Sequence, residues 1–150
     1  MKFIFIDRIL ELTPGKSIVG TKYIGPEEGF FRDHFPGFPV VPGVLLTEMM
    51  AQTAGKCLDA EQSGRGKAML IQIRSAHFRQ WVGPGSQAVI RACIKANLPQ
   101  CATAICHVEV ENKKIADAEL LFCFVPLETF GARYQDAILT EFLTHNPTGQ

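Results

Sequence analysis

Apolar and polar positions alternate in several short segments of this chain, and one long stretch is apolar almost throughout. Residues 2–12 and 16–25 are rich in Ile, Phe, Val and Tyr, which predicts two strands around a turn at 13–16. Four more strands are expected later in the chain, at about 67–81, 86–97, 101–111 and 114–126. Because only short turns separate these consecutive strands, we expect them to pair in an antiparallel sheet.

The long apolar stretch predicts a helix from Val44 to about Glu61. It contains no proline, and its apolar side chains cover nearly the whole helical circumference, which is typical of a helix buried in a core. At ~1.5 Å per residue this helix would span ~27 Å, about the width of a small domain. A shorter amphipathic helix is expected from about Tyr134 to His145. The order of elements favours an α+β fold in which an antiparallel sheet wraps around one long central helix.

Length and charge narrow the class of protein. The 150 residues suffice for one domain with its own core, so we expect a single domain over residues 1–150 with a C-terminal helical extension from about 130. Fifteen basic and fifteen acidic side chains cancel, so no strongly basic field favours nucleic acid as a partner. Apolar runs fall short of the roughly 18 residues of a transmembrane helix, and charges follow the first residues too closely for a signal peptide. We therefore expect a cytoplasmic protein without membrane insertion.

Cysteine and histidine usage argues against disulfides and metals. The chain has five cysteines, an odd number, and no two of them form a CxxC pair. Each lies among apolar residues, where a free cysteine behaves as a small hydrophobe, so reduced thiols are expected. The four histidines show no close metal-ligand spacing, and we expect no metal site.

The most informative stretch is a stiff loop that leads into the long helix. Residues 26–43 contain four of the nine prolines, which predicts an ordered loop, and His34 is the only titratable group in its stiff second part. Histidine titrates near neutrality and suits a general base. The alternative is a histidine that only hydrogen-bonds its own loop.

A single acid, Glu48, lies in the apolar helix. Gln52 follows it one turn later on the same face. Two polar groups on one face of an apolar helix suggest a polar pocket, in which a desolvated carboxyl group would stay protonated and act as an acid. The alternative is a narrow polar stripe that faces solvent.

The helix opens with Pro42 and Gly43. Proline is favoured at a helix start, and glycine has no side chain to block a ligand. The free N–H groups of the first turn can bind a developing negative charge, as an oxyanion hole requires. A base, an acid and an anion-binding backbone, without any nucleophile motif, fit elimination or addition next to a carbonyl group.

The run from His34 to Gly55, HFPGFPVVPGVLLTEMMAQTAG, resembles the motif of the β-hydroxyacyl-acyl-carrier-protein dehydratases of the FabZ type, with the FabA type as relatives. Weaker resemblance extends from about Phe3 to Phe124. It implies a hot-dog fold and at least a homodimer, with a trimer of dimers as a further possibility. It also implies no cofactor of the enzyme's own, because the substrate arrives on the phosphopantetheine arm of acyl carrier protein.

The resemblance also implies roles for individual residues. His34 would remove the α-proton of a (3R)-3-hydroxyacyl thioester, and Glu48 would protonate the leaving β-hydroxyl. Gly43, beside Val44, would bind the thioester oxygen through its backbone N–H, and Gln52 would support the acid. In such enzymes the histidine and the acid that meet come from different protomers.

An acidic carrier protein should dock on basic residues near the tunnel mouth. Arg79, Arg74 and Lys67 are the candidates, and the alternative is that they belong to a solvated strand face. Several positions depart from the family pattern, among them His77, Trp81 and Ser86, which leaves the acyl chain length and the pathway open between fatty acids and specialised chains such as polyenes.

Three other functions stay open at this point. A hot-dog acyl thioesterase would release a free thiol, but it leaves the His34 and Glu48 motif unexplained. A non-catalytic acyl-thioester-binding protein would need neither residue. A dehydratase that also isomerises the double bond, as FabA-type relatives do, normally carries aspartate where this chain has Glu48.

Overall fold

The structure is a computed structural model that describes residues 3–131 and 134–146. Its sheet consists of six strands: β1 (Arg8–Thr13), β2 (Ser17–Ile24), β3 (Lys67–Phe78), β4 (Ser86–Asn97), β5 (Cys101–Val110) and β6 (Lys113–Val125). The helices are α1 (Gly43–Asp59), α2 (Ala137–His145) and two short 3₁₀ turns, η1 (Gly29–Arg32) and η2 (Leu127–Phe130). The expected long helix, shorter terminal helix and six strands are all present, with some changed boundaries.

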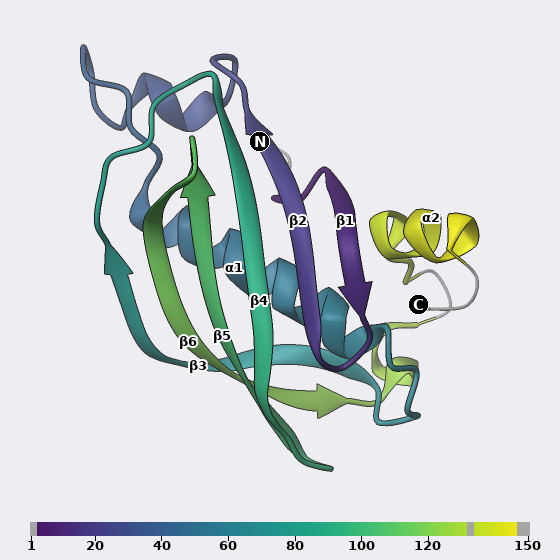
Figure 1. Cartoon of the computed structure of the whole chain (residues 1–150). Helices are drawn as coiled ribbons and strands as arrows, with labels where there is room; N and C mark the ends of the chain where they lie inside the picture. The colour runs from purple at the N-terminus through teal and green to yellow at the C-terminus, as the bar shows by residue number, and fades with distance from the viewer. Residues whose placement is uncertain (1–2, 132–133, 147–150) are drawn as a thin grey trace.

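The six strands form one antiparallel sheet in the order β1-β2-β4-β5-β6-β3. It curves around α1, which lies across its concave face (Figure 1). Strands β1 and β3 are the two edges. The predicted α+β hot-dog architecture, an antiparallel sheet wrapped around a long central helix, is therefore confirmed.

Small side chains on the concave face let the sheet approach α1 closely. Inward-facing positions of β4, β5 and β6 are buried and are often alanine: Ala88, Ala92, Ala102, Ala104, Ala116 and Ala118. The helix fills this space with larger side chains, including Leu46, Met49 and Met50, each at most 2% exposed. Burial on most sides explains why the helix sequence is apolar around most of its circumference.

The expected first strand, 2–12, is wrong over residues 3–7, because β1 begins only at Arg8, and residue 2 lies outside the described residues. Residues Phe5 and Ile6 are apolar because they are buried in the core, at 1% and 0% exposure. The N–H of Phe5 donates to the side chain of Gln52 on α1 at 2.8 Å, rather than to a neighbouring strand. The apolar character of Phe5 and Ile6 therefore predicts burial correctly. It does not predict which group accepts the hydrogen bond from the Phe5 N–H, because tertiary contacts decide that.

The third strand and the last helix are shorter than expected. Strand β3 ends at Phe78. The N–H groups of Arg79 and Gln80 both donate to the carbonyl oxygen of Ile115, so the regular pairing between β3 and β6 stops there. Helix α2 begins at Ala137, after Asp136, whose carboxylate accepts from the N–H of Leu139 as an N-cap.

Candidate active site

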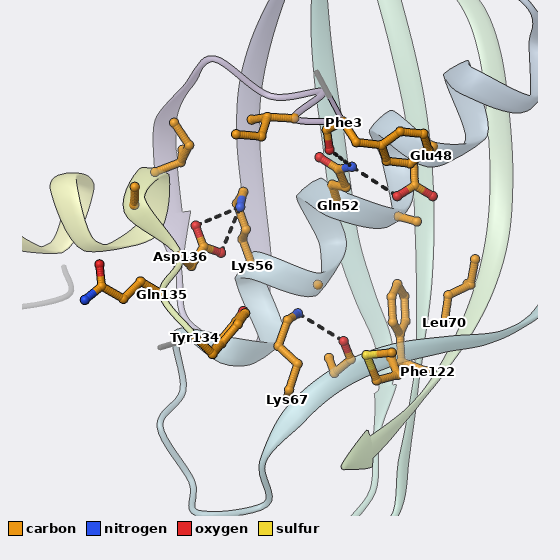
Figure 2. Close-up of a pocket in the computed structure, with 17 residues that line it drawn as sticks. Phe3, Glu48, Gln52, Lys56, Lys67, Leu70, Phe122, Tyr134, Gln135 and Asp136 are labelled. Atoms are coloured by element: carbon orange, nitrogen blue, oxygen red, sulfur yellow. Dashed lines mark hydrogen bonds and ion pairs between the residues drawn. The ribbon is translucent and has the colours of Figure 1, made fainter. Parts of the chain in front are cut away.

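A groove of about 510 Å³ runs along one face of α1 (Figure 2). The helix contributes one stripe of residues at spacings of three and four: Glu48, Ala51, Gln52, Gly55 and Lys56. The opposite walls come from the N-terminal segment (Phe3, Ile4), from β3 (residues 67–70), from Phe122 of β6 and from residues 134–138 before and at the start of α2. Segments far apart in the sequence therefore meet over the helix face that carries the predicted acid.

Glu48 lies in this groove and is half-buried. Its Oε1 accepts a hydrogen bond from Gln52 Nε2 at 3.0 Å. The same nitrogen donates to the Phe3 carbonyl oxygen at 2.9 Å, and Gln52 Oε1 accepts from the Phe5 N–H at 2.8 Å. All hydrogen-bonding atoms of the Gln52 amide except one acceptor lone pair are thus engaged. The pairing of Glu48 with Gln52, expected from their spacing, is present.

His34 is held by its own loop through one ring nitrogen. Its Nδ1 lies 3.1 Å from the carbonyl oxygen of Val40, while the Val40 N–H donates to the His34 carbonyl oxygen at 2.9 Å. Since a carbonyl oxygen can only accept, this contact assigns the proton of the neutral imidazole to Nδ1. Nε2 is then the nitrogen with a free lone pair. A hydrogen bond between His34 and its own loop was the alternative to a catalytic role. The contact with Val40 is such a bond, but it orients the ring and leaves Nε2 as a basic atom.

Gly43 is the first residue of α1, directly after the N-cap Pro42. The N–H groups of Gly43 and Val44 have no acceptor within the helix, because the first turn has no preceding carbonyl groups. The Phe78 ring stands beside Gly43: a Cβ on this residue would lie 3.2 Å from three of its carbon atoms. The absence of a side chain at Gly43 therefore makes room for this ring at the helix N-terminus.

The described chain does not bring all the predicted catalytic groups into one cavity. Glu48 and Gln52 line the groove, but among its described lining residues neither His34 nor Gly43 occurs. Val44, three-quarters exposed, also lies outside the groove.

The three basic residues considered for carrier-protein docking are each paired with an acid. Arg79 Nε lies 2.6 Å from Asp117 Oδ2, Arg74 Nη1 lies 3.3 Å from Glu119 Oε2, and Lys67 Nζ lies 2.6 Å from Asp59 Oδ2. The arginine side chains are about half exposed. Lys67 differs, because its side chain is only 19% exposed and it lines the groove.

The acids in these pairs have shifted pKa values. Desolvation acts to raise the pKa of Asp117, but hydrogen bonds and charges from Arg79 and His77 outweigh it and the pKa is lowered. For Asp59, desolvation by burial dominates and raises the pKa, although the charge of Lys67 and the N–H of Ala68 oppose it. The surroundings of Asp117 therefore favour its charged form. Burial of Asp59 favours its neutral form, and only the charge of Lys67 and the hydrogen bond from the Ala68 N–H oppose this.

Sequence reasoning missed the polar residues at the far end of the groove. Lys56 Nζ lies 2.9 and 2.8 Å from the two carboxylate oxygens of Asp136, eighty positions later in the chain. Tyr134 lies beside them, and burial and the charges of Asp59 and Asp136 raise the pKa of its hydroxyl to about 12. The sequence offered one indication of this cluster, which is that Lys56 follows Gln52 by four residues and so lies on the same face of the helix. That spacing could not identify Asp136 as the partner of Lys56.

Other predicted features can be placed in the described residues. Cys57 and Cys106 are buried, and desolvation raises the pKa of each thiol to about 12. Across residues 3–131 and 134–146, no group of three or more His, Cys, Asp or Glu side chains is arranged to hold a metal ion. None of the helices in the described part of the chain is long and apolar enough to span a membrane.

Comparison with known proteins places the chain in a family. Residues 1–119 match the model of the FabA-like domain. The 3-hydroxyacyl-[acyl-carrier-protein] dehydratase FabZ of Lactobacillus helveticus is 40% identical over 120 residues, which cover 79% of this chain and 81% of that protein. The FabZ of Lawsonia intracellularis is 38% identical over 134 residues, covering 85% and 86%. The chain belongs to the FabZ-type dehydratase family. The predicted family, and with it the prediction of a hydro-lyase, is confirmed.

Solved structures agree on the fold of this FabZ-type chain. The dehydratase heterocomplex ApeI:P from Xenorhabdus doucetiae superposes with a TM-score of 0.61 at 21% identity, covering 82% of this chain and 99% of that one. The E. coli PaaI protein from the phenylacetic acid degradation operon has a TM-score of 0.63 at 14% identity, covering 80% and 79%. At these identities the likeness concerns the fold alone.

Proposed function

We propose that this chain dehydrates (3R)-3-hydroxyacyl thioesters carried by acyl carrier protein to trans-2-enoyl thioesters. The observation that carries the proposal is the carboxyl group of Glu48, held by Gln52 in the wall of a groove of about 510 Å³. The names of the FabZ relatives support the reaction type. The substrate brings its own phosphopantetheine arm, so the enzyme needs no cofactor of its own.

In the proposed reaction, Nε2 of His34 takes the α-proton and the N–H of Gly43 binds the thioester oxygen while it carries the negative charge. Glu48 gives a proton to the β-hydroxyl, which leaves as water, and the α–β double bond forms. His34 is then an imidazolium and Glu48 a carboxylate, and exchange with solvent restores both. General acid–base help of this kind contributes typically ~10²–10⁴-fold, and one oxyanion donor about 10²–10³-fold.

The working unit in this proposal is a homodimer, with a trimer of dimers as a larger form. Strand β3 is an edge of the sheet and twelve residues long, and it exposes Met69, Ile71, Ile73 and Phe78. A long, apolar free edge favours pairing with another strand. Because β3 also lines the groove next to Glu48, a second copy paired there would close the groove and could present its own His34.

Carrier-protein docking is proposed at the half-exposed Arg79 and Arg74, where an acidic surface could share their charges with Asp117 and Glu119. Lys67 is better placed to meet the arm or the acyl chain than the carrier surface, because it lines the groove. Charge reversal of Arg79 should raise KM for acyl carrier protein substrates and leave kcat little changed. Unchanged carrier-protein kinetics in Arg79→Glu would contradict this docking surface.

The function is tested by incubating the purified chain with 3-hydroxyacyl carrier-protein thioesters of several lengths and following water loss by mass. His34→Ala and Glu48→Gln should each lower the dehydration rate about 10²–10⁴-fold. His145→Ala and Glu141→Gln, exposed on α2, are matched controls that should retain it. Near wild-type rates in the first two variants would refute the mechanism, and release of a free carrier thiol would favour a thioesterase instead.

A further inference from the structure

We propose that Tyr134 and Asp136 form the closed end of the acyl groove and set the longest acyl chain that the enzyme accepts. This inference rests on the proposed dehydratase function and names a determinant of its substrate range. The segment lies outside residues 1–119, which match the family model, so family membership does not assign it.

Two cavities meet at this segment. The groove that holds Glu48 has a volume of about 510 Å³, and a second cavity of about 380 Å³ lies beyond it under the end of α1 and the start of α2. The two cavities share three lining residues, Lys67, Tyr134 and Asp136. These side chains therefore separate a site for the reacting end of a substrate from a further space that a longer chain could enter.

The separating wall is anchored to the helix that carries the acid. Asp136 makes two short contacts with Lys56 of α1, at 2.9 and 2.8 Å, and also caps α2 through the N–H of Leu139. Leu139 is 7% exposed and belongs to the core. Figure 2 shows Lys56 and Asp136 facing each other, with Tyr134 beside Lys67 on the same side of the groove. Asp136 is therefore tied to α1 and to the core, and Tyr134, which is 37% exposed, lies two residues before this anchor.

The dimensions are those of an acyl site of limited length. Glu48 and Lys56 are eight residues apart on α1, which corresponds to ~12 Å along the helix axis. Between them lies Gly55, where a Cβ would lie 3.7 Å from Lys67 Nζ and 4.0 Å from Phe122. A methyl group fits there without disturbing the fold, so the groove can be narrowed at Gly55 and lengthened at Tyr134 by separate substitutions.

The experiment measures kcat/KM for dehydration of 3-hydroxyacyl carrier-protein thioesters of increasing even length. In Tyr134→Ala the longest accepted chain should grow, with about a tenfold gain for a substrate two methylenes beyond the wild-type limit, because the added methylenes find a cavity to fill. Gly55→Ala should act in the opposite direction and lower the rate for long chains selectively. In both variants the change relative to wild type should grow with the length of the substrate, so the length profile is the readout.

Matched controls separate this role from a general effect. Tyr23→Ala removes the other tyrosine, which is exposed on β2 and lines neither cavity, and should leave the length profile unchanged. Tyr134→Leu replaces the ring with a smaller apolar side chain in case Tyr134→Ala folds poorly, and its limit should also move to longer chains. Thermal unfolding of each variant verifies that the fold is retained.

The outcomes distinguish the two proposals. If the wild-type chain dehydrates substrates but the length limit is the same in Tyr134→Ala, Tyr134→Leu and Gly55→Ala, the wall does not set chain length and the proposed function stands. If the wild-type chain dehydrates no length at all, both proposals are overturned.

Discussion

Gln52 connects Glu48 to the N-terminal segment through a single amide group. It donates to Glu48 Oε1 at 3.0 Å and to the Phe3 carbonyl oxygen at 2.9 Å, while its own oxygen accepts from the Phe5 N–H at 2.8 Å. Since the Phe5 N–H can only donate, it forces the amide nitrogen to face the carboxyl group. The orientation of the proposed acid thus depends on backbone atoms more than forty positions earlier in the chain.

Replacing Gln52 by Met should impair both stability and catalysis. The variant keeps the side-chain length but leaves the Phe5 N–H and the Phe3 carbonyl without their partner, so we expect the free energy of unfolding to fall by about 1–3 kcal/mol. The dehydration kcat should fall as well, because Glu48 loses the donor that orients it. Urea unfolding and steady-state kinetics measure the two effects. An unfolding free energy equal to that of the wild type would show that Gln52 does not anchor the N-terminal segment.

A site shared between chains should be restored by mixing two inactive variants. If His34 and Glu48 of one site come from different chains, a mixed dimer of His34→Ala and Glu48→Gln contains one intact site and one doubly damaged site. Random mixing should then recover about a quarter of the wild-type activity. Co-expression with two affinity tags isolates the mixed dimers for assay. Failure of purified mixed dimers to exceed the two parent variants would place both residues of a site in one chain.

Gly43→Ala should damage activity without damaging the fold. Alanine is no worse than glycine in a helix, so the free energy of unfolding should change by less than about 1 kcal/mol. The added Cβ meets the Phe78 ring at 3.2 Å. The ring and the methyl group would together crowd the Gly43 N–H, which is proposed to bind the thioester oxygen. We expect kcat/KM to fall about 10–100-fold. Partial recovery in Gly43→Ala combined with Phe78→Ala would identify crowding as the cause, and full activity of Gly43→Ala would contradict it.

Lys67→Met should make the stability of the protein depend strongly on pH. Burial already raises the pKa of Asp59, and loss of the lysine raises it further. The folded variant then holds a proton that the unfolded chain, with a carboxyl pKa near ~3.9, has released. The free energy of unfolding of Lys67→Met should therefore fall as pH rises from the carboxyl pKa of the unfolded chain to the raised pKa of Asp59 in the folded variant. Relative to wild type, we expect a loss of roughly 3 kcal/mol at pH 7 that becomes smaller toward pH 4.

Urea unfolding of Lys67→Met at several pH values checks this dependence. The control is Asp59→Asn combined with Lys67→Met, which removes the titrating carboxyl group. In this double variant the difference in unfolding free energy from wild type should no longer change strongly with pH. A stability loss in Lys67→Met that is the same at pH 4 and pH 7 would show that Asp59 is not the group responsible.

The cysteines should differ sharply in reactivity. Burial raises the pKa of the Cys57 and Cys106 thiols to about 12, whereas Cys93 is exposed. At pH 8 the two buried residues carry about 10³-fold less thiolate than an ordinary cysteine. Iodoacetamide followed by peptide mass mapping should label Cys93 in the native protein and the two buried cysteines only after addition of urea. Comparable labelling of Cys57 in the native state would disprove their protection.

Much of the fold is determined by local pattern. The helix from Gly43 to Asp59 is predictable because a mostly apolar stretch that contains no proline and is longer than a typical strand is characteristic of a buried helix. The antiparallel strands follow from short turns between runs with strand-forming residues. The motif from His34 to Gly55 also predicted the family correctly, because the whole motif lies in one contiguous segment of the sequence.

Other features were decided only by the tertiary structure. Residues 3–7 were predicted as strand, but Phe5 bonds to Gln52 instead, because a helix side chain and not a neighbouring strand lies beside its N–H. Lys56 and Asp136 are eighty residues apart in the sequence, and no local pattern around either residue predicts their ion pair. Local periodicity and one contiguous motif were enough to predict the reaction class and most of the helices and strands, since both depend on residues that are near one another in the sequence. The walls of the groove were determined by tertiary structure, because they consist of distant segments that meet only when the sheet closes around α1.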